Sequence, residues 1–238
     1  MNYNYLYKQV SVFGQFQNIN TGDLSKRLYD MLKGKMIPSM TKEFDIRAQR
    51  VNDRPGFTSV SGDMNMTIGS ERIDIISGGN MLSHKDFLCK ARNCLEKFFA
   101  VVGRIALFRL SFICDILLKT ITEDDNNIAE KYINLTGIYG KKPLKGWTAG
   151  SVSEDMWSFD DINEPVNINI TVSLNGLNQG VPDISEAVPI VKGLILHQDL
   201  NTSGENISPR FEAKDSYDFM NWADSKHTEI LSSVAGGL

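Results

Sequence analysis

Three histidines, His84, His197 and His227, are the side chains of this chain best suited to acid–base or metal chemistry. Their positions show neither the His-x-x-x-His nor the His-x-His spacing that brings two ligands to one metal. Catalysis would require a histidine to meet a carboxylate in the folded chain. We therefore interpret the three as hydrogen-bonded core or interface residues, and we predict no catalytic residue, no cofactor and no metal site.

The candidate nucleophiles are three cysteines, Cys89, Cys94 and Cys114. They lie in apolar stretches, and the chain contains no Cys-x-x-Cys pair of the kind that binds zinc. A thiol becomes a nucleophile when it is exposed beside a base, and apolar surroundings have the opposite effect. We predict buried, unreactive and reduced thiols, which are typical of a cytoplasmic protein.

Two acidic pairs, Glu154-Asp155 and Asp160-Asp161, flank Trp157. Paired carboxylates can hold a cation, but these lack the Asp-x-Asp-x-Asp-Gly arrangement of a calcium loop. A solvated edge is the favoured interpretation. The chain also lacks a phosphate-binding loop, a dinucleotide-binding glycine fingerprint and a nucleophile elbow.

Aromatic and apolar residues are better candidates for recognition, because such side chains supply binding area. The candidate binding residues are Trp222, His227, Leu231, Trp147 and Trp157. In the last helix, Trp222 and Leu231 widen the apolar arc beyond the one stripe that a helix needs for its own core. One flank of this helix is therefore a candidate surface for self-association or for a partner. Burial of both flanks within the monomer remains an equal alternative.

The overall charge limits the choice of partner. The formal net charge is −4 and the isoelectric point is near 5.4, which argues against a general binder of nucleic acids or anionic membranes. The most apolar stretch, Phe98–Leu118, is interrupted by Arg109 and Asp115, which would lie deep in a bilayer if it spanned one. We found no secretory signal pattern at the N-terminus, and we predict a cytoplasmic protein without a membrane partner.

The elements that must position these side chains centre on residues 83–118. Ser83 followed by Asp86 predicts the start of a helix that runs to Val102 and ends at Gly103. From Ala106 to Leu118, apolar residues alternate with a more polar set, which predicts an inner strand packed on that helix. Its apolar series is Ala106, Phe108, Leu110, Phe112, Cys114, Ile116 and Leu118.

Periodicity and turn residues predict the other elements. The expected strands are Tyr3–Phe16, about 44–48, Phe57–Val60, Met64–Ile68, Arg72–Ile76, Trp147–Phe159, Val166–Asn175 and Ile190–Leu200. The expected helices cover Leu24–Lys33, a segment from Thr122 to Gly137, and about Asp215–Val234. Residues Asn52–Gly56 are expected to break the chain between two strands.

These elements predict an α+β fold with a largely antiparallel, curved sheet and four helices. Residues 1–103 form a β-α-β4-α half and residues 104–238 a β-α-β3-α half, packed as one globular unit. This order resembles the duplicated half-unit of the TATA-binding-protein-like and helix-grip folds, and the chain also resembles bacterial proteins of similar length without an assigned activity. The resemblance rests on element order over most of the chain, so it implies a fold and transfers no functional residue.

We interpret the chain as a non-catalytic prokaryotic or phage protein that binds through its sheet face or loop ends. It would be an accessory or regulatory subunit that engages a protein partner or a second copy. One alternative is an enzyme with a pocket between sheet and helices, using His197 or His227 with a carboxylate. A second alternative is nucleic-acid binding through the sheet face, which the acidic balance disfavours.

Overall fold

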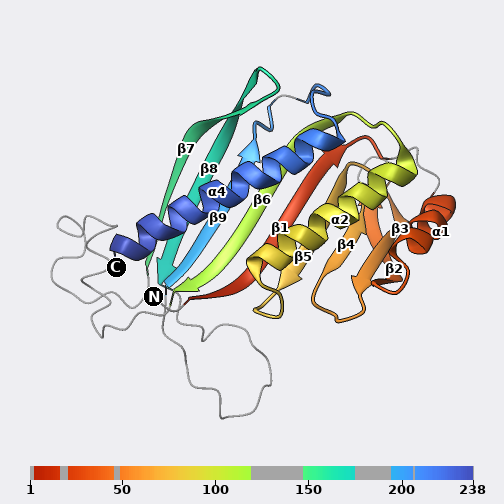
Figure 1. Cartoon of the computed structure of the whole chain (residues 1–238), viewed down its shortest axis with the longest axis horizontal. Coiled ribbons are helices and arrows are strands. Elements are labelled where there is room, and N and C mark those ends of the chain that lie inside the picture. Colours follow the sequence, from red (N-terminus) through yellow and green to blue (C-terminus); the bar gives the residue numbers. More distant parts are fainter. Residues whose placement is uncertain are drawn as a thin grey trace, which may run out of the picture.

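The structure, a computed structural model, describes residues 3–16, 21–45, 49–118, 147–174, 194–205 and 207–237. Its strands are β1 (Tyr3–Gly14), β2 (Met36–Asp45), β3 (Arg50–Ser59), β4 (Asn65–Ile68), β5 (Arg72–Gly78), β6 (Leu107–Leu118), β7 (Trp147–Phe159), β8 (Ile162–Leu174) and β9 (Leu194–Thr202), labelled as in Figure 1. Its helices are α1 (Thr21–Leu32), α2 (His84–Val102) and α4 (Ala213–Gly237).

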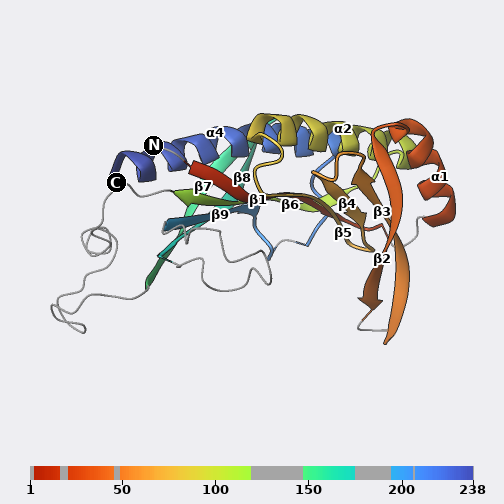
Figure 2. The ribbon, with the colours of Figure 1, turned by 90° about the horizontal axis from the view of Figure 1, so that it is seen from below.

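The nine strands of the described chain form one sheet in the order β2-β3-β4-β5-β1-β6-β9-β8-β7. Every neighbouring pair is antiparallel. The three described helices lie on one side of the sheet, which bends at β2 and β3 (Figure 2). The α+β class and the large antiparallel sheet are therefore confirmed. The helix expected between Thr122 and Gly137 lies outside the described residues, and the plan of four helices in two repeated halves stays a prediction.

The helix and the inner strand predicted at the centre of the fold are confirmed, but β6 packs mainly on α4, while α2 packs on β1. The hydroxyl of Ser83 accepts a hydrogen bond of 3.1 Å from the Asp86 amide and so caps α2. Gly103 ends the helix with a φ of 80°, a conformation that glycine adopts without steric cost. β6 is an inner strand between β1 and β9. Among the described helices, none combines the length and the apolar character that a bilayer crossing requires.

The predicted apolar series of β6 is wrong at the first residues of the strand. Leu107 is fully buried, whereas Phe108 is only half-buried and Ala106 is exposed. The cause is a register shift between β1 and β6, where Phe13 pairs with Arg109 but Gly14 pairs with Leu107. Such a bulge changes the face on which the following side chains lie, and simple alternation does not reveal it.

The expected break at Asn52–Gly56 is also wrong, because these residues lie inside β3. Pro55 pairs with Met40 of β2, while the pairing of β3 with β4 covers only Gly56–Thr58. Within the part of the chain that the structure describes, β3 therefore has a strand neighbour on one side only at Pro55. A proline, which has no N–H to donate, is tolerated in a strand at such an edge.

Candidate functional site

The two faces of the central strands carry different side chains. Val10 of β1, Phe112 of β6 and Leu200 of β9 are buried on the helix face, the side covered by the described helices. The side chains that alternate with them form the opposite side, which we call the polar face. Its central residues are Arg72 and Asp74 of β5, Tyr7, Gln9 and Ser11 of β1, Arg109, Ser111 and Asp115 of β6, and His197, Asp199 and Asn201 of β9.

His197 meets a carboxylate at the middle of the polar face. It lies directly opposite Asp115 in the register of β6 and β9, and its Nδ1 is 2.6 Å from Asp115 Oδ1. Their side chains are 41% and 31% exposed, respectively. The hydrogen bond to Asp115 raises the pKa of His197, against the lowering effect of its partial burial. Since Nδ1 donates to the carboxylate, the neutral ring keeps Nε2 as a proton acceptor.

A hydrogen-bonded network fixes the polar side chains toward β5. Asp74 Oδ1 accepts bonds from Gln9 Nε2 at 2.8 Å and from Ser11 Oγ at 2.6 Å. The other carboxylate oxygen of Asp74 is 2.7 Å from Arg72 Nε, and the Tyr7 hydroxyl donates to Gln9 Oε1. Gln9, Ser11 and Asp74 are buried by this packing. The polar groups are therefore satisfied by one another.

A second network lies toward β9. Asn201 Oδ1 accepts a bond of 3.1 Å from Arg109 Nη2, and its Nδ2 donates to Asp199 Oδ1 at 3.1 Å. The guanidinium of Arg109 also lies 5.1 Å from the centre of the Phe13 ring, as a cation–π contact. The polar face is therefore a preorganised surface of mixed charge.

The other two histidines converge on the helix face, in a group that we call the histidine core cluster: Tyr5, His84, Phe112, Asp224 and His227. The ring centres of His84 and His227 are 4.5 Å apart. His84 Nε2 is 2.8 Å from Asp224 Oδ1, and the Tyr5 hydroxyl is 3.1 Å from His227 Nε2. Phe112 of β6 presents its ring to both imidazoles.

Burial favours the neutral form of both imidazoles in this cluster. It lowers the pKa of His227 to about 3, with a further lowering from His84. His227 Nδ1 is 2.9 Å from Gln198 Oε1, and because an amide oxygen only accepts, Nδ1 carries the proton and Nε2 accepts from Tyr5. Burial also lowers the pKa of His84, although Asp224 acts in the opposite direction. Both rings therefore serve as hydrogen-bonded core residues.

The predicted enzyme site, a sheet–helix pocket with a histidine and a carboxylate, is divided between the two faces. His227 lies between sheet and helices, but its hydrogen-bond partners are Tyr5 and Gln198. His197 has a carboxylate partner, but on the face away from the described helices. The sequence placed Asp115 in the polar set of its strand. It contained no indication that His84 and His227 would be in contact, because that contact joins two helices far apart in the chain.

The predicted recognition residues are mostly inside the protein. Trp147, Trp157 and Leu231 are buried, as is His227. Trp157 stacks on Phe159 with ring centres 4.1 Å apart, and Trp222 is half-buried and stacks on Phe219 at 5.8 Å. These residues present little surface to a partner in this monomer. Their role in binding stays a prediction.

The acidic pairs and cysteines show no metal chemistry in the described residues. Asp155 Oδ2 lies 2.7 Å from Lys226 Nζ, and Asp160 forms an ion pair with Lys214. Within the described ranges, no group of three or more histidine, cysteine or acidic side chains could hold a metal ion. Cys94 and Cys114 are buried as predicted. Cys89 is exposed, contrary to prediction, because it is not among the residues that α2 buries.

One apolar surface was not predicted. Beyond the reach of β4, residues 40–45 of β2 and 50–55 of β3 form a two-stranded extension of the sheet edge, which we call the edge ribbon. Met40, Phe44 and Val51 lie on one side of it and are 64%, 60% and 58% exposed, and the exposed facing residues Lys42 and Asp53 lie on that side between Met40 and Phe44. The sequence analysis missed this feature because it treated residues 52–56 as a break.

The opposite side of the edge ribbon is anchored. Arg54 Nε is 2.6 Å from Glu43 Oε2, and Glu43 Oε1 accepts a bond of 2.9 Å from Ser70 Oγ in the β4–β5 turn. The ribbon is therefore fixed to the sheet on its polar side, while its apolar side is exposed.

No protein-family model matches this chain, and no curated protein matches it. The assignment of function therefore rests on the residues and their geometry.

Proposed function

We propose that this chain is a non-catalytic interaction protein, an accessory or regulatory subunit that docks a protein partner on the apolar side of the edge ribbon. The observation that carries the proposal is the exposure of Met40, Phe44 and Val51 together on one side of a two-stranded sheet edge. Exposed apolar side chains that share one surface with charged neighbours, here Lys42 and Asp53, are typical of protein interfaces.

Two features of the ribbon support docking. Among the described strands, β2 has a neighbour on one side only, so a partner strand can add to this edge. The Glu43 contacts with Arg54 and Ser70 hold the ribbon in place before a partner arrives. Preorganisation of this kind lowers the entropy cost of association.

Site-specific photocrosslinking tests the proposal. A benzophenone amino acid replaces Phe44 in one variant and the exposed Ile207, outside the ribbon, in a control. Irradiation in the source cells should give a discrete adduct at position 44 and not at position 207. An adduct of twice the chain mass means self-association, and any other mass means a different protein partner.

Polar substitution provides the matched test. The double variant Met40→Ser and Phe44→Ser should lose association while its circular dichroism spectrum and melting temperature stay those of the parent. Equal crosslinking at positions 44 and 207, or full association of the double variant, would refute docking on the ribbon.

A second candidate function is catalysis by His197, supported by its hydrogen bond of 2.6 Å to Asp115 on an accessible face. Asp115 would orient the ring, and Nε2 would accept a proton from a substrate or a water molecule. Hydrolysis of a panel of activated esters and phosphates, compared between the parent and His197→Gln, tests this. Equal rates for the two proteins would remove the candidate.

Nucleic-acid binding through the sheet receives less support. Asp74, Asp115 and Asp199 on the polar face outnumber Arg72 and Arg109, and a phosphate backbone would meet repulsion there. Salt-dependent retention of the protein on DNA or RNA would favour nucleic-acid binding over protein docking.

The proposal includes a cytoplasmic setting in a prokaryote or its phage. The free thiols of Cys89, Cys94 and Cys114 are consistent with a reducing compartment. It also retains the two repeated halves, since β1-α1-β2-β3-β4-β5-α2 has the element order expected of the first half.

A further inference from the structure

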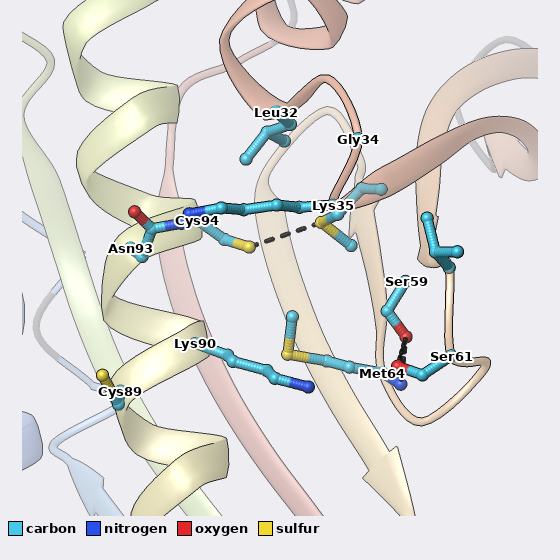
Figure 3. Close-up of a pocket in the computed structure, with 12 residues that line it drawn as sticks. Leu32, Gly34, Lys35, Ser59, Ser61, Met64, Cys89, Lys90, Asn93 and Cys94 are labelled. Atoms are coloured by element: carbon cyan, nitrogen blue, oxygen red, sulfur yellow. Dashed lines mark hydrogen bonds between the residues drawn. The ribbon is translucent and has the colours of Figure 1, made fainter.

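A second surface feature lies at the other end of β2, where α1, α2 and the β3–β4 turn enclose a pocket of about 650 Å³ (Figure 3). That volume is within the range of small-molecule sites. Leu32, Met36, Met64 and Cys94 form its buried apolar lining. The exposed residues Lys35, Val60 and Cys89 also line it. The pocket therefore combines an apolar interior with access from solvent.

The apolar lining is uncharged and adaptable. Burial raises the pKa of Cys94 to about 11, so this thiol stays neutral, and its sulfur lies 3.4 Å from the sulfur of Met36. The Met36 and Met64 side chains are flexible and polarisable, which allows them to follow the shape of an unbranched chain. These walls suit an alkyl group.

Two lysines bring positive charge to the pocket from opposite walls. Lys35 extends across it toward α2, and Lys90 extends from α2 toward the β3–β4 turn (Figure 3). Lys90 Nζ is 2.9 Å from Asp63 Oδ2. Burial alone would raise the pKa of Asp63, but hydrogen bonds from Ser59 and Lys90 outweigh it and lower the pKa to about 2. The ionised Asp63 thus neutralises Lys90.

Lys35 is the cation left for a ligand. Within the described residues it has no ion-pair partner. Its backbone is held in the tight turn that follows α1: its amide donates to Leu32 at 2.9 Å, its carbonyl accepts from Val60 at 3.1 Å, and Gly34 takes a φ of 78°. The backbone of Lys35 is therefore fixed by the fold, and among the described residues its positive charge has no acidic partner.

From this combination we infer that the pocket binds a monoanionic amphiphile of the fatty-acid class. The carboxylate of the ligand pairs with Lys35 Nζ, and its unbranched chain lies against Leu32, Met36, Met64 and Cys94. A charge-assisted bond to the carboxylate gives the pocket its preference for an anion, and the apolar lining gives it a dependence on chain length. This site is separate from the apolar side of the edge ribbon and does not depend on the proposed docking.

Calorimetric titration with decanoate, below its micelle point, tests the inference on the full chain. Decanoate should bind at one site, hexanoate at least about tenfold more weakly because it buries fewer methylene groups, and decyltrimethylammonium not at all. Lys35→Gln should weaken decanoate about tenfold, as expected for loss of a charge-assisted bond. Lys85→Gln, an equal change of charge on α2 outside the pocket, should bind as the parent does.

The exposed thiol of Cys89 gives a second measurement that needs no variant. Bound decanoate should slow its alkylation by N-ethylmaleimide, because Cys89 lines the pocket. The inference is overturned if decanoate does not bind, if the cationic amphiphile binds equally well, or if Lys35→Gln binds as tightly as Lys85→Gln. Binding that leaves Cys89 alkylation unchanged would place the ligand elsewhere and would also overturn it.

Discussion

Strand β6 separates two histidine environments that differ in almost every physical respect. On the helix face, Phe112 contacts the neighbouring rings of His84 and His227. On the polar face, Asp115 holds the partly exposed His197. Burial lowers the pKa of His227 to about 3, whereas the hydrogen bond to Asp115 raises the pKa of His197.

The comparison shows that a histidine acquires its role from its surroundings. Where water is excluded and the hydrogen-bond partners are neutral, as around His227, the ring stays uncharged and serves the core. Where a carboxylate is present and water has access, as around His197, the ring readily takes up a proton. His197 on the polar face can therefore exchange a proton with solvent, whereas the histidines of the helix face contribute to the stability of the core.

The largest expected effect separates the two faces of β6 at adjacent residues. Phe112→Ala should lower the free energy of unfolding by about 3–5 kcal/mol, because it leaves a cavity beside both buried imidazoles. Ile113→Ala, on the polar face, should cost about 1 kcal/mol. Urea unfolding of both variants measures the difference. Equal costs would mean that the two sides of the strand are packed alike, contrary to the structure.

The second prediction concerns the free energy of unfolding at acidic pH. A histidine whose pKa is lowered by folding binds fewer protons in the folded state than in the unfolded state once the pH is below its unfolded pKa of about 6.5. The free energy of unfolding is therefore highest above that pH and decreases as the pH falls below it. For His227, with a folded pKa of about 3, the loss should approach about 1.4 kcal/mol per pH unit between about pH 6 and about pH 4. Urea unfolding at several pH values measures the slope.

Two histidine variants show which face of the sheet causes this pH dependence of the unfolding free energy. His227→Gln removes a titrating group from the core, so its unfolding free energy should depend less steeply on pH, although it starts lower at neutral pH. His197→Gln should keep the acid dependence of the parent, because its histidine lies outside the cluster. A slope unchanged in His227→Gln would contradict the neutral buried ring.

The smallest effect is expected from the pair on the polar face. A double-mutant cycle with His197→Gln and Asp115→Asn should give a coupling free energy of about 0.2–1 kcal/mol, since both side chains are partly exposed and solvent screens their interaction. Because the folded pKa of His197 is raised, this coupling should be complete below about pH 6.5 and should fade as pH rises through the folded pKa. A coupling that strengthens at alkaline pH would contradict the assignment.

Much of the architecture follows from the sequence alone. The Ser83 cap, the apolar stripe of α2 and the terminating Gly103 define that helix by local rules, and the structure confirms it. The strand Trp147–Phe159 is also confirmed, with the same bounds. Such features depend on residues close together in the chain, whose periodicity is visible in one dimension.

The register of the strands, the edges of the sheet and the contacts between distant residues were decided by the tertiary structure, because local sequence patterns do not contain them. A bulge between β1 and β6 moved Phe108 out of the apolar series. In the described chain the pairing of β4 with β3 ends at Gly56, so Pro55 can lie within β3 and the edge ribbon is exposed. Alternation placed Asp115 on the polar side of its strand. It did not show that the register of β6 and β9 would bring to it a histidine 82 residues away. The pairing of strands depends on contacts across the whole chain, and for that reason the candidate sites became visible only in the folded protein.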